Sequence, residues 1–205
     1  MSKKTENSII ELISKTIQNN YDFFDSNSEI KEVISEIVEL TNDAIDFIPL
    51  NKDVSFEQIF SFHGFTPLSY GIFVSLLSGN LPSCFSQLRI LIEFYAMMIL
   101  SKKNFPEDDS FTQMKKIQKQ YRKNTSKMMK ECDPKIYELW KSLSSWMHGI
   151  TYSRKAVRNV IKGQVSQYHM IHPALYDKKD FEQLFELKFQ IRAFRKIIQE
   201  KNNNS

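Results

Sequence analysis

The sequence is poor in the two residues that most often interrupt regular structure. Of its 205 residues, five are glycine and six are proline. This scarcity disfavours an all-β sandwich or barrel, because such folds need many tight turns. Cysteine is rarer still: Cys84 and Cys132 are the only two, and they do not form a C-x-x-C motif. Two cysteines make no disulfide framework, so a reducing, cytoplasmic environment is expected.

Several motifs that define large classes of enzyme are also missing. The chain contains no G-x-G-x-x-G, no G-x-x-x-x-G-K-[ST] and no G-x-S-x-G, so neither a nucleotide-binding fold nor an α/β-hydrolase is indicated. His169 and His172 stand close together in HMIHP, but no cysteine or carboxylate joins them at helical spacing. We therefore expect no metal site and no cofactor. The segment MSKKTENSIIELISK has no long apolar stretch and no small-residue cleavage site, so no secretion signal is predicted.

Most of what is present is typical of amphipathic helices. Apolar residues recur at helical spacing in successive segments. The predicted fold class is all-α: a single helical bundle of about seven to eight helices with a buried central hairpin. Residues 1–200 are expected to form one domain, with acidic helices within 8–48, a core over about 65–200 and a disordered tail at 201–205. The expected helices cover residues 8–19, 28–48, 68–78, 82–101, 107–131, 134–148 and 177–201, with shorter helical stretches at 56–62 and 151–161.

Residues 64–100 are the least charged part of the chain, and Arg89 and Glu93 are their only charged residues. Gly79, Asn80 and Pro82 divide this stretch, since Asn and Gly end helices readily and Pro favours the first turn of the next helix. A buried helical hairpin is the prediction. A membrane hairpin is the alternative, but its first arm is shorter than the ~20 residues that span a bilayer, and its second arm carries both charges. No membrane association is therefore expected.

Arg89 and Glu93 lie at positions i and i+4 of the second arm and so share one face of its helix. Because this helix is apolar nearly all round, the face is expected to be buried, and a buried charge needs a partner. Two interpretations follow. The residues form a structural ion pair, or they form a polar pocket that binds an anion or orients a catalytic group.

His148 closes the predicted helix 134–148, which Gly149 is expected to end. Lys141 lies on the same flank of this helix. An imidazole can transfer protons near neutral pH, which makes His148 a candidate general acid or base. Alternatively, a histidine at a helix end caps the last carbonyl groups and meets the helix dipole.

Charge is unevenly distributed along the chain. The first 60 residues contain five basic and twelve acidic residues, whereas the whole chain has a net charge of +4. Either one part meets an anion or an acidic partner, or the acidic N-terminal helices pack against basic helices of the same fold or of a dimer. Clusters of basic residues neutralise RNA phosphates, although a solvated helix face has the same composition. The candidate nucleic-acid-binding residues lie in two such runs: Lys115, Lys119, Arg122 and Lys123, then Arg154 and Arg158.

The segment VSLLSGNLPSCFSQLRILIEFYAMMIL, followed later in the chain by LWKSLSSWMHG, resembles the HEPN-like helical bundles over residues 65–155. The resemblance implies an all-helical, often dimeric module, whose relatives include RNA-cleaving toxins, defence effectors and non-catalytic proteins that bind nucleotides or proteins. Active members use an R-x(4–6)-H motif, in which His handles a proton and Arg stabilises charge on phosphorus. In this chain Lys141, Ser142 and Leu143 occupy the positions where that arginine would precede His148.

Two functional hypotheses result. The first is an RNA-directed protein of a defence or toxin–antitoxin system, with an antitoxin or other protein partner and a metal-independent endoribonuclease activity. In it His148 is the acid or base, Arg89 the phosphate stabiliser, Glu93 the orienting group and Lys141 a supplementary charge. The second is a non-catalytic protein-interaction or dimerisation module, in which Arg89 and Glu93 hold the central helices in register. A homodimer is expected in both.

Overall fold

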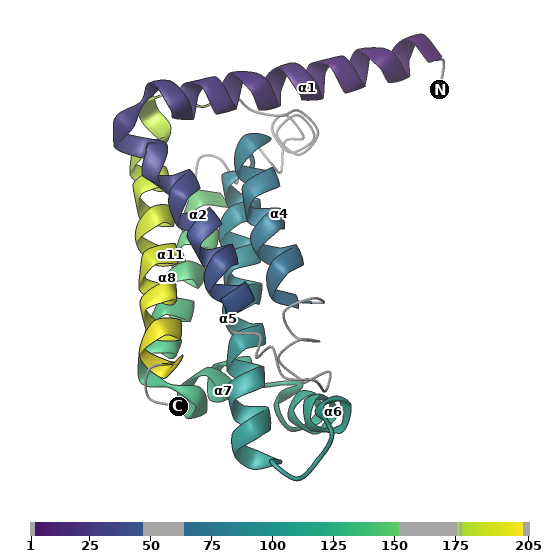
Figure 1. The fold of residues 1–205 in the computed structure, drawn as a ribbon, viewed down its shortest axis with the longest axis vertical. Coiled ribbons are helices and arrows are strands. Elements are labelled where there is room, and N and C mark those ends of the chain that lie inside the picture. Colours follow the sequence, from purple (N-terminus) through teal and green to yellow (C-terminus); the bar gives the residue numbers. More distant parts are fainter. Residues whose placement is uncertain (1–2, 47–63, 152–175, 177, 203–205) are drawn as a thin grey trace.

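The computed structural model describes residues 3–46, 64–151, 176 and 178–202, and most of these residues are helical (Figure 1). No β-strand is found in this part of the chain, so the prediction of an all-α helical bundle is confirmed. In chain order the elements are α1 (Lys3–Ser26), α2 (Ser28–Asp46), α4 (Thr66–Leu77), α5 (Leu81–Asn104), α6 (Ser110–Tyr121), α7 (Thr125–Cys132), α8 (Pro134–Thr151), the short 3₁₀ helix η2 (Lys178–Asp180) and α11 (Phe181–Asn202).

The predicted central hairpin is present as α4 and α5. Gly79 makes the turn with a φ of 75°, a left-handed conformation that glycine adopts without steric cost. The Asn80 side chain then accepts the backbone N–H of Ser83 at 3.1 Å and caps the start of α5. From there α5 runs through the centre of the bundle and contacts α4, α6, α7, α8 and α11.

The position of α5 explains its composition. Leu88, Leu91 and Ile92 are fully buried among the neighbouring helices. Among the described helices, α5 alone is long and apolar enough to cross a membrane, and half of its apolar window is buried inside the protein. The core helix of a globular bundle has the same length and composition, because it must bury apolar side chains on most of its circumference.

The acidic charge of α2 is neutralised by α11, which lies beside it (Figure 1). The Arg195 guanidinium contacts Asp43 at 2.6 Å and Glu36 at 2.8 Å. Arg192 contacts Glu36 as well, at 2.6 Å. Lys188 adds a further ion pair with Glu32, which lowers the pKa of that carboxyl. For α2, the charge asymmetry of the sequence therefore reflects packing within the fold.

Two helix boundaries in the second half of the chain differ from the prediction. The expected single helix over 107–131 is wrong: it is divided into α6 and α7. The side chain of Asn124 accepts the backbone N–H of Lys127 at 3.0 Å and starts a new helix there. The expected stop at Gly149 is also wrong, because α8 continues through it to Thr151.

The bounds of the two terminal helices differ from the prediction: α1 is longer, and α11 begins at Phe181, after η2, rather than at residue 177. α1 spans Lys3–Ser26 rather than 8–19, and Phe24, which lies beyond the predicted end, is fully buried against the ring of Tyr176. Lys201 and Asn202 belong to α11 rather than to a disordered tail, and the Lys201 ammonium lies 3.0 Å from the Asp133 carboxylate. The helices expected at 56–62 and at 152–161 and the tail residues 203–205 lie outside the described residues.

Candidate functional site

Arg89 and Glu93 form an ion pair on α5, with 3.1 Å between Nε of Arg89 and Oε1 of Glu93. Each side chain is 26% exposed, so the expectation of full burial is wrong. The pair lies where α5 meets α8, and the solvent there reduces the cost of holding two charges.

Trp140 of α8 completes this cluster. Its indole Nε1–H donates to the same Glu93 oxygen at 2.6 Å. The Arg89 guanidinium carbon lies 4.7 Å from the centre of the Trp140 ring, which is a cation–π distance. Glu93 thus accepts hydrogen bonds from both Arg89 and Trp140, while the Arg89 guanidinium lies over the face of the Trp140 indole. Of the two interpretations of Arg89 and Glu93, these contacts favour the structural ion pair over the polar pocket.

The sequence pattern did not indicate this role for Trp140. Its helical spacing predicts a core residue of α8, and the side chain is half-buried. The residue lies 47 positions from Glu93, too far for any local pattern to relate the two. The one signal in the sequence is chemical: a tryptophan on an otherwise apolar face carries an N–H that needs an acceptor.

The other predicted catalytic residues lie further along α8. The Lys141 ammonium is exposed and lies 3.8 Å from the Glu138 carboxylate. His148 is part of α8, but its side chain lies outside the described residues. Its backbone position is eight residues beyond Trp140, which corresponds to about 12 Å along the helix axis.

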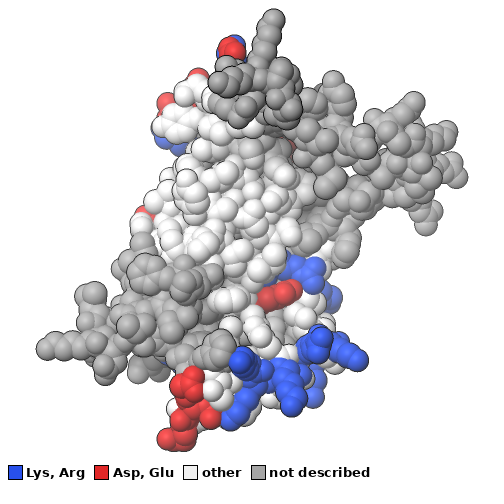
Figure 2. Space-filling view, turned by 90° about the vertical axis from the view of Figure 1, so that its right-hand side faces the viewer, with Lys and Arg blue, Asp and Glu red and all other residues white. Residues whose placement is uncertain are grey.

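A second candidate site lies beside this cluster. A surface cavity of about 510 Å³, here called the α6–α7 cavity, is bounded by α5, α6 and α7. Three of the predicted nucleic-acid-binding residues, Lys115, Lys119 and Arg122, line it. All three are exposed, and Lys123 is exposed next to them. Figure 2 shows lysine and arginine side chains gathered at the lower end of the molecule, where α6 and α7 lie in Figure 1.

The break between α6 and α7 shapes this cavity. Because the chain turns at Asn124, both helices contribute to one hollow: Lys115 and Lys119 lie on α6, Arg122 lies in the turn, and Thr125 and Met128 lie on α7. A continuous helix over 107–131 would have distributed these cations along a single straight face. Lys115, Lys119 and Arg122 all precede the break and follow helical spacing, so a continuous helix would also place them on one face. What the break adds is the part of the cavity wall that α7 contributes.

The rest of the cavity wall combines apolar side chains, such as Met97 and Ile117, with polar groups that have partners of their own. The Tyr121 hydroxyl donates a hydrogen bond to the Glu131 carboxylate. Burial and this carboxylate raise the pKa of Tyr121 to about 12, so the phenol keeps its proton at neutral pH. Glu93 also lines the cavity and is paired there with Arg89. An anion entering the cavity thus meets three cations, and the acid on the wall has its own counter-ion.

Arg154 and Arg158, the second predicted basic run, lie outside the described residues. Within the described ranges, no three His, Cys, Asp or Glu side chains come together in a way that could hold a metal ion. The geometry defines an all-helical protein with a basic surface cavity next to an Arg–Glu–Trp cluster. No family model, no curated protein and no solved structure matches the chain.

Proposed function

We propose that this protein binds single-stranded RNA through the α6–α7 cavity. The observation that supports the proposal is the convergence of Lys115, Lys119 and Arg122 on one hollow of about 510 Å³. Backbone phosphates are recognised by such clusters of lysine and arginine, independently of base sequence. The resemblance of residues 65–155 to HEPN-like bundles, many of which act on RNA, favours RNA over other polyanions.

Binding is measured by fluorescence anisotropy of a labelled single-stranded RNA of mixed sequence. The double substitution Lys119→Ala and Arg122→Ala is expected to weaken binding about tenfold or more, since two phosphate contacts are lost. The matched control is Lys15→Ala with Lys31→Ala, which removes the same charge from exposed ion pairs on α1 and α2. Equal losses in the two doubles would mean that only net charge matters, and the cavity would not be the binding site.

RNA cleavage is a separate hypothesis, which the resemblance suggests. It predicts that the protein cuts RNA in the presence of EDTA and that His148→Ala abolishes cutting while binding is retained. The contacts of Arg89 with Glu93 and Trp140 favour a structural role for these residues over a catalytic one. Intact RNA after long incubation at saturating protein would exclude the nuclease and leave the binding proposal in place.

A second candidate function, a homodimerisation module, is supported by the outer face of the α4–α5 hairpin. Tyr70, Val74 and Ile90 are 64%, 43% and 45% exposed on it. Figure 2 shows a broad area without charged side chains above the basic end. Exposed apolar patches of this kind mark association sites. In a two-fold symmetric dimer a face meets its own copy, so an uncharged face avoids opposing like charges.

The dimer is tested by sedimentation equilibrium over a range of protein concentrations. Wild-type protein is expected to be dimeric at micromolar concentration, and Val74→Glu to be monomeric with an unchanged helical circular dichroism spectrum. Lys31→Glu on α2 is the control, because it also changes an exposed residue. A wild-type protein that stays monomeric at the highest concentration would exclude this function.

A further inference from the structure

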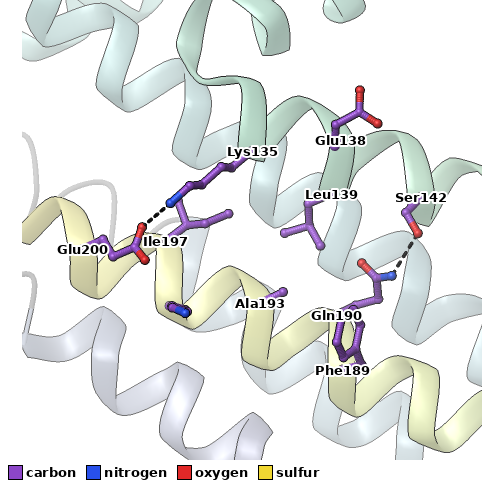
Figure 3. A pocket seen from close by; sticks show the side chains of 10 residues that line it. Lys135, Glu138, Leu139, Ser142, Phe189, Gln190, Ala193, Ile197 and Glu200 are labelled. Atoms are coloured by element: carbon purple, nitrogen blue, oxygen red, sulfur yellow. Dashed lines mark hydrogen bonds and ion pairs between the residues drawn. The ribbon is translucent and has the colours of Figure 1, made fainter.

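A second hollow lies on another side of the bundle, between α8 and α11 (Figure 3). Its volume is about 420 Å³, within the range of small-molecule sites. The apolar part of its surface comes from Leu139 of α8 and from Ala193 and Ile197 of α11, with Phe189 at the edge. Phe189 is 64% exposed, so an aromatic ring already stands in solvent beside the groove.

Gln190 gives this groove a specific polar group. Its side chain is only 3% exposed, and its Nε2 donates to the Ser142 hydroxyl at 2.9 Å and to the Glu186 carboxylate. Because a carboxylate accepts hydrogen bonds and does not donate them, the amide nitrogen must face Glu186. This fixes the orientation of the amide. The carbonyl oxygen Oε1 is then buried, and none of the described residues donates to it.

Buried carbonyl oxygens without a donor are rare, and each one calls for an explanation. Figure 3 shows this oxygen turned away from Ser142, toward the side of the groove where Leu139 and Ala193 lie. Gln190 thus places one unpaired hydrogen-bond acceptor just beneath the apolar surface of the groove. At its far end Lys135 and Glu200 are paired with each other at 2.7 Å.

We propose that the α8–α11 groove binds a small aromatic heterocycle whose ring N–H donates to Oε1 of Gln190. The ring packs on Leu139, Ala193 and Ile197, and Phe189 contacts its edge or face, an arrangement that aromatic pairs favour. Such a molecule supplies one hydrogen-bond donor for Oε1 of Gln190 and one flat apolar surface that packs on the groove. The site is separate from the α6–α7 cavity, and the proposal does not depend on RNA binding.

The probe is indole, which has a flat ring and one N–H, and its partner is benzothiophene, which has nearly the same shape and no donor. Binding to the full chain is followed by methyl NMR of Ala193, Leu139 and Ile197. Indole is expected to shift these signals saturably, and benzothiophene to bind about tenfold more weakly because it leaves the acceptor unpaired. Equal affinities for the two probes would refute the role of Gln190.

Two variants separate the acceptor from the groove. Gln190→Met keeps the side-chain length and is expected to bind both probes equally. Ala193→Leu fills the groove without touching the amide and is expected to abolish binding of indole, with circular dichroism showing that the fold is kept. If indole gives no saturable shift in the wild-type protein, or binds Ala193→Leu unchanged, the groove is not a ligand site and a bound water is the partner of Oε1. Neither outcome affects the RNA-binding proposal.

Discussion

Glu93 on α5 and Trp140 on α8 are joined by a hydrogen bond of 2.6 Å between the carboxylate and the indole N–H. The same carboxylate oxygen also accepts from Arg89 at 3.1 Å. The two charges within the apolar stretch of α5 that ends at Leu100 are therefore part of the contact between α5 and α8. Glu93 is at the same time a wall residue of the α6–α7 cavity, so it connects the helix packing with the candidate binding site.

Replacing Glu93 is expected to destabilise the protein, because the indole N–H of Trp140 loses its acceptor. Glu93→Ala should lower the free energy of unfolding by about 1–3 kcal/mol. Glu93→Gln should cost less, since an amide oxygen still accepts the N–H. Urea denaturation followed by Trp140 fluorescence, in a Trp146→Phe background that leaves one tryptophan, measures both. Equal losses for the two variants would mean that the negative charge, and not the acceptor, is what matters.

The salt dependence of RNA binding should show which cavity residues contact RNA phosphates. For single strands the logarithm of the binding constant falls with the logarithm of salt concentration with a slope of about −0.7 per phosphate contact. Lys119→Ala and Arg122→Ala are each expected to reduce the slope by about 0.7. Lys31→Ala should leave it unchanged, because this lysine is paired with Asp25 on the α1–α2 side. Anisotropy titrations at several salt concentrations provide the slopes.

Arg195 should contribute more to stability than Arg192, although both pair with α2. Arg195 is 16% exposed and holds Glu36 and Asp43, which are 10% and 14% exposed. Arg195→Met leaves Asp43 without its arginine and Glu36 with Arg192 alone, and is expected to cost about 3 kcal/mol. Arg192 is 57% exposed, so solvent screens its loss and Arg192→Met should cost clearly less. Thermal and urea unfolding compare the two, and a reversed order would contradict the importance assigned to Arg195.

The Asp133 carboxylate is expected to make the protein less stable as the pH falls into the acid range. Burial raises the pKa of its carboxyl, but hydrogen bonds from Lys201 and from the backbone N–H of Lys135 outweigh this effect, so the pKa lies below its ordinary value of 3.8. A group with a lowered pKa in the folded state stabilises the fold above its ordinary pKa, and this stabilisation is lost as pH falls through the lowered value.

The variant Asp133→Asn keeps an oxygen for the N–H of Lys135 but removes the charge that meets Lys201. The wild-type protein should therefore be more stable than this variant by a constant amount above about pH 5, and the difference should disappear in stronger acid. Urea unfolding at a series of pH values measures it. A difference that does not change with pH would show that the ionised carboxylate contributes nothing. Asp133→Ala also removes the cap of α8 and should cost about 1 kcal/mol at neutral pH.

Local pattern predicted most of the helices correctly. The all-α class, the turn at Gly79 and the capped start of α5 follow from residue types within a few positions of each other. The same local chemistry was available at Asn124, where a capping residue ends one helix and begins the next. There, helical periodicity continued across the break and masked it.

The sequence by itself determined which segments are helical and which helix is central, because periodicity, caps and apolar content act over one or two turns. Only the tertiary structure decided what the charged residues contact. The pairing of Glu93 with Arg89 is local, but its second partner, Trp140, lies 47 residues away, and the partners of Arg195 lie about 150 residues away, all on other helices. The helix break at Asn124 adds residues of α7 to the wall of the cavity that the basic stretch lines. These relations depend on how helices pack, and packing is set by contacts among all of them at once.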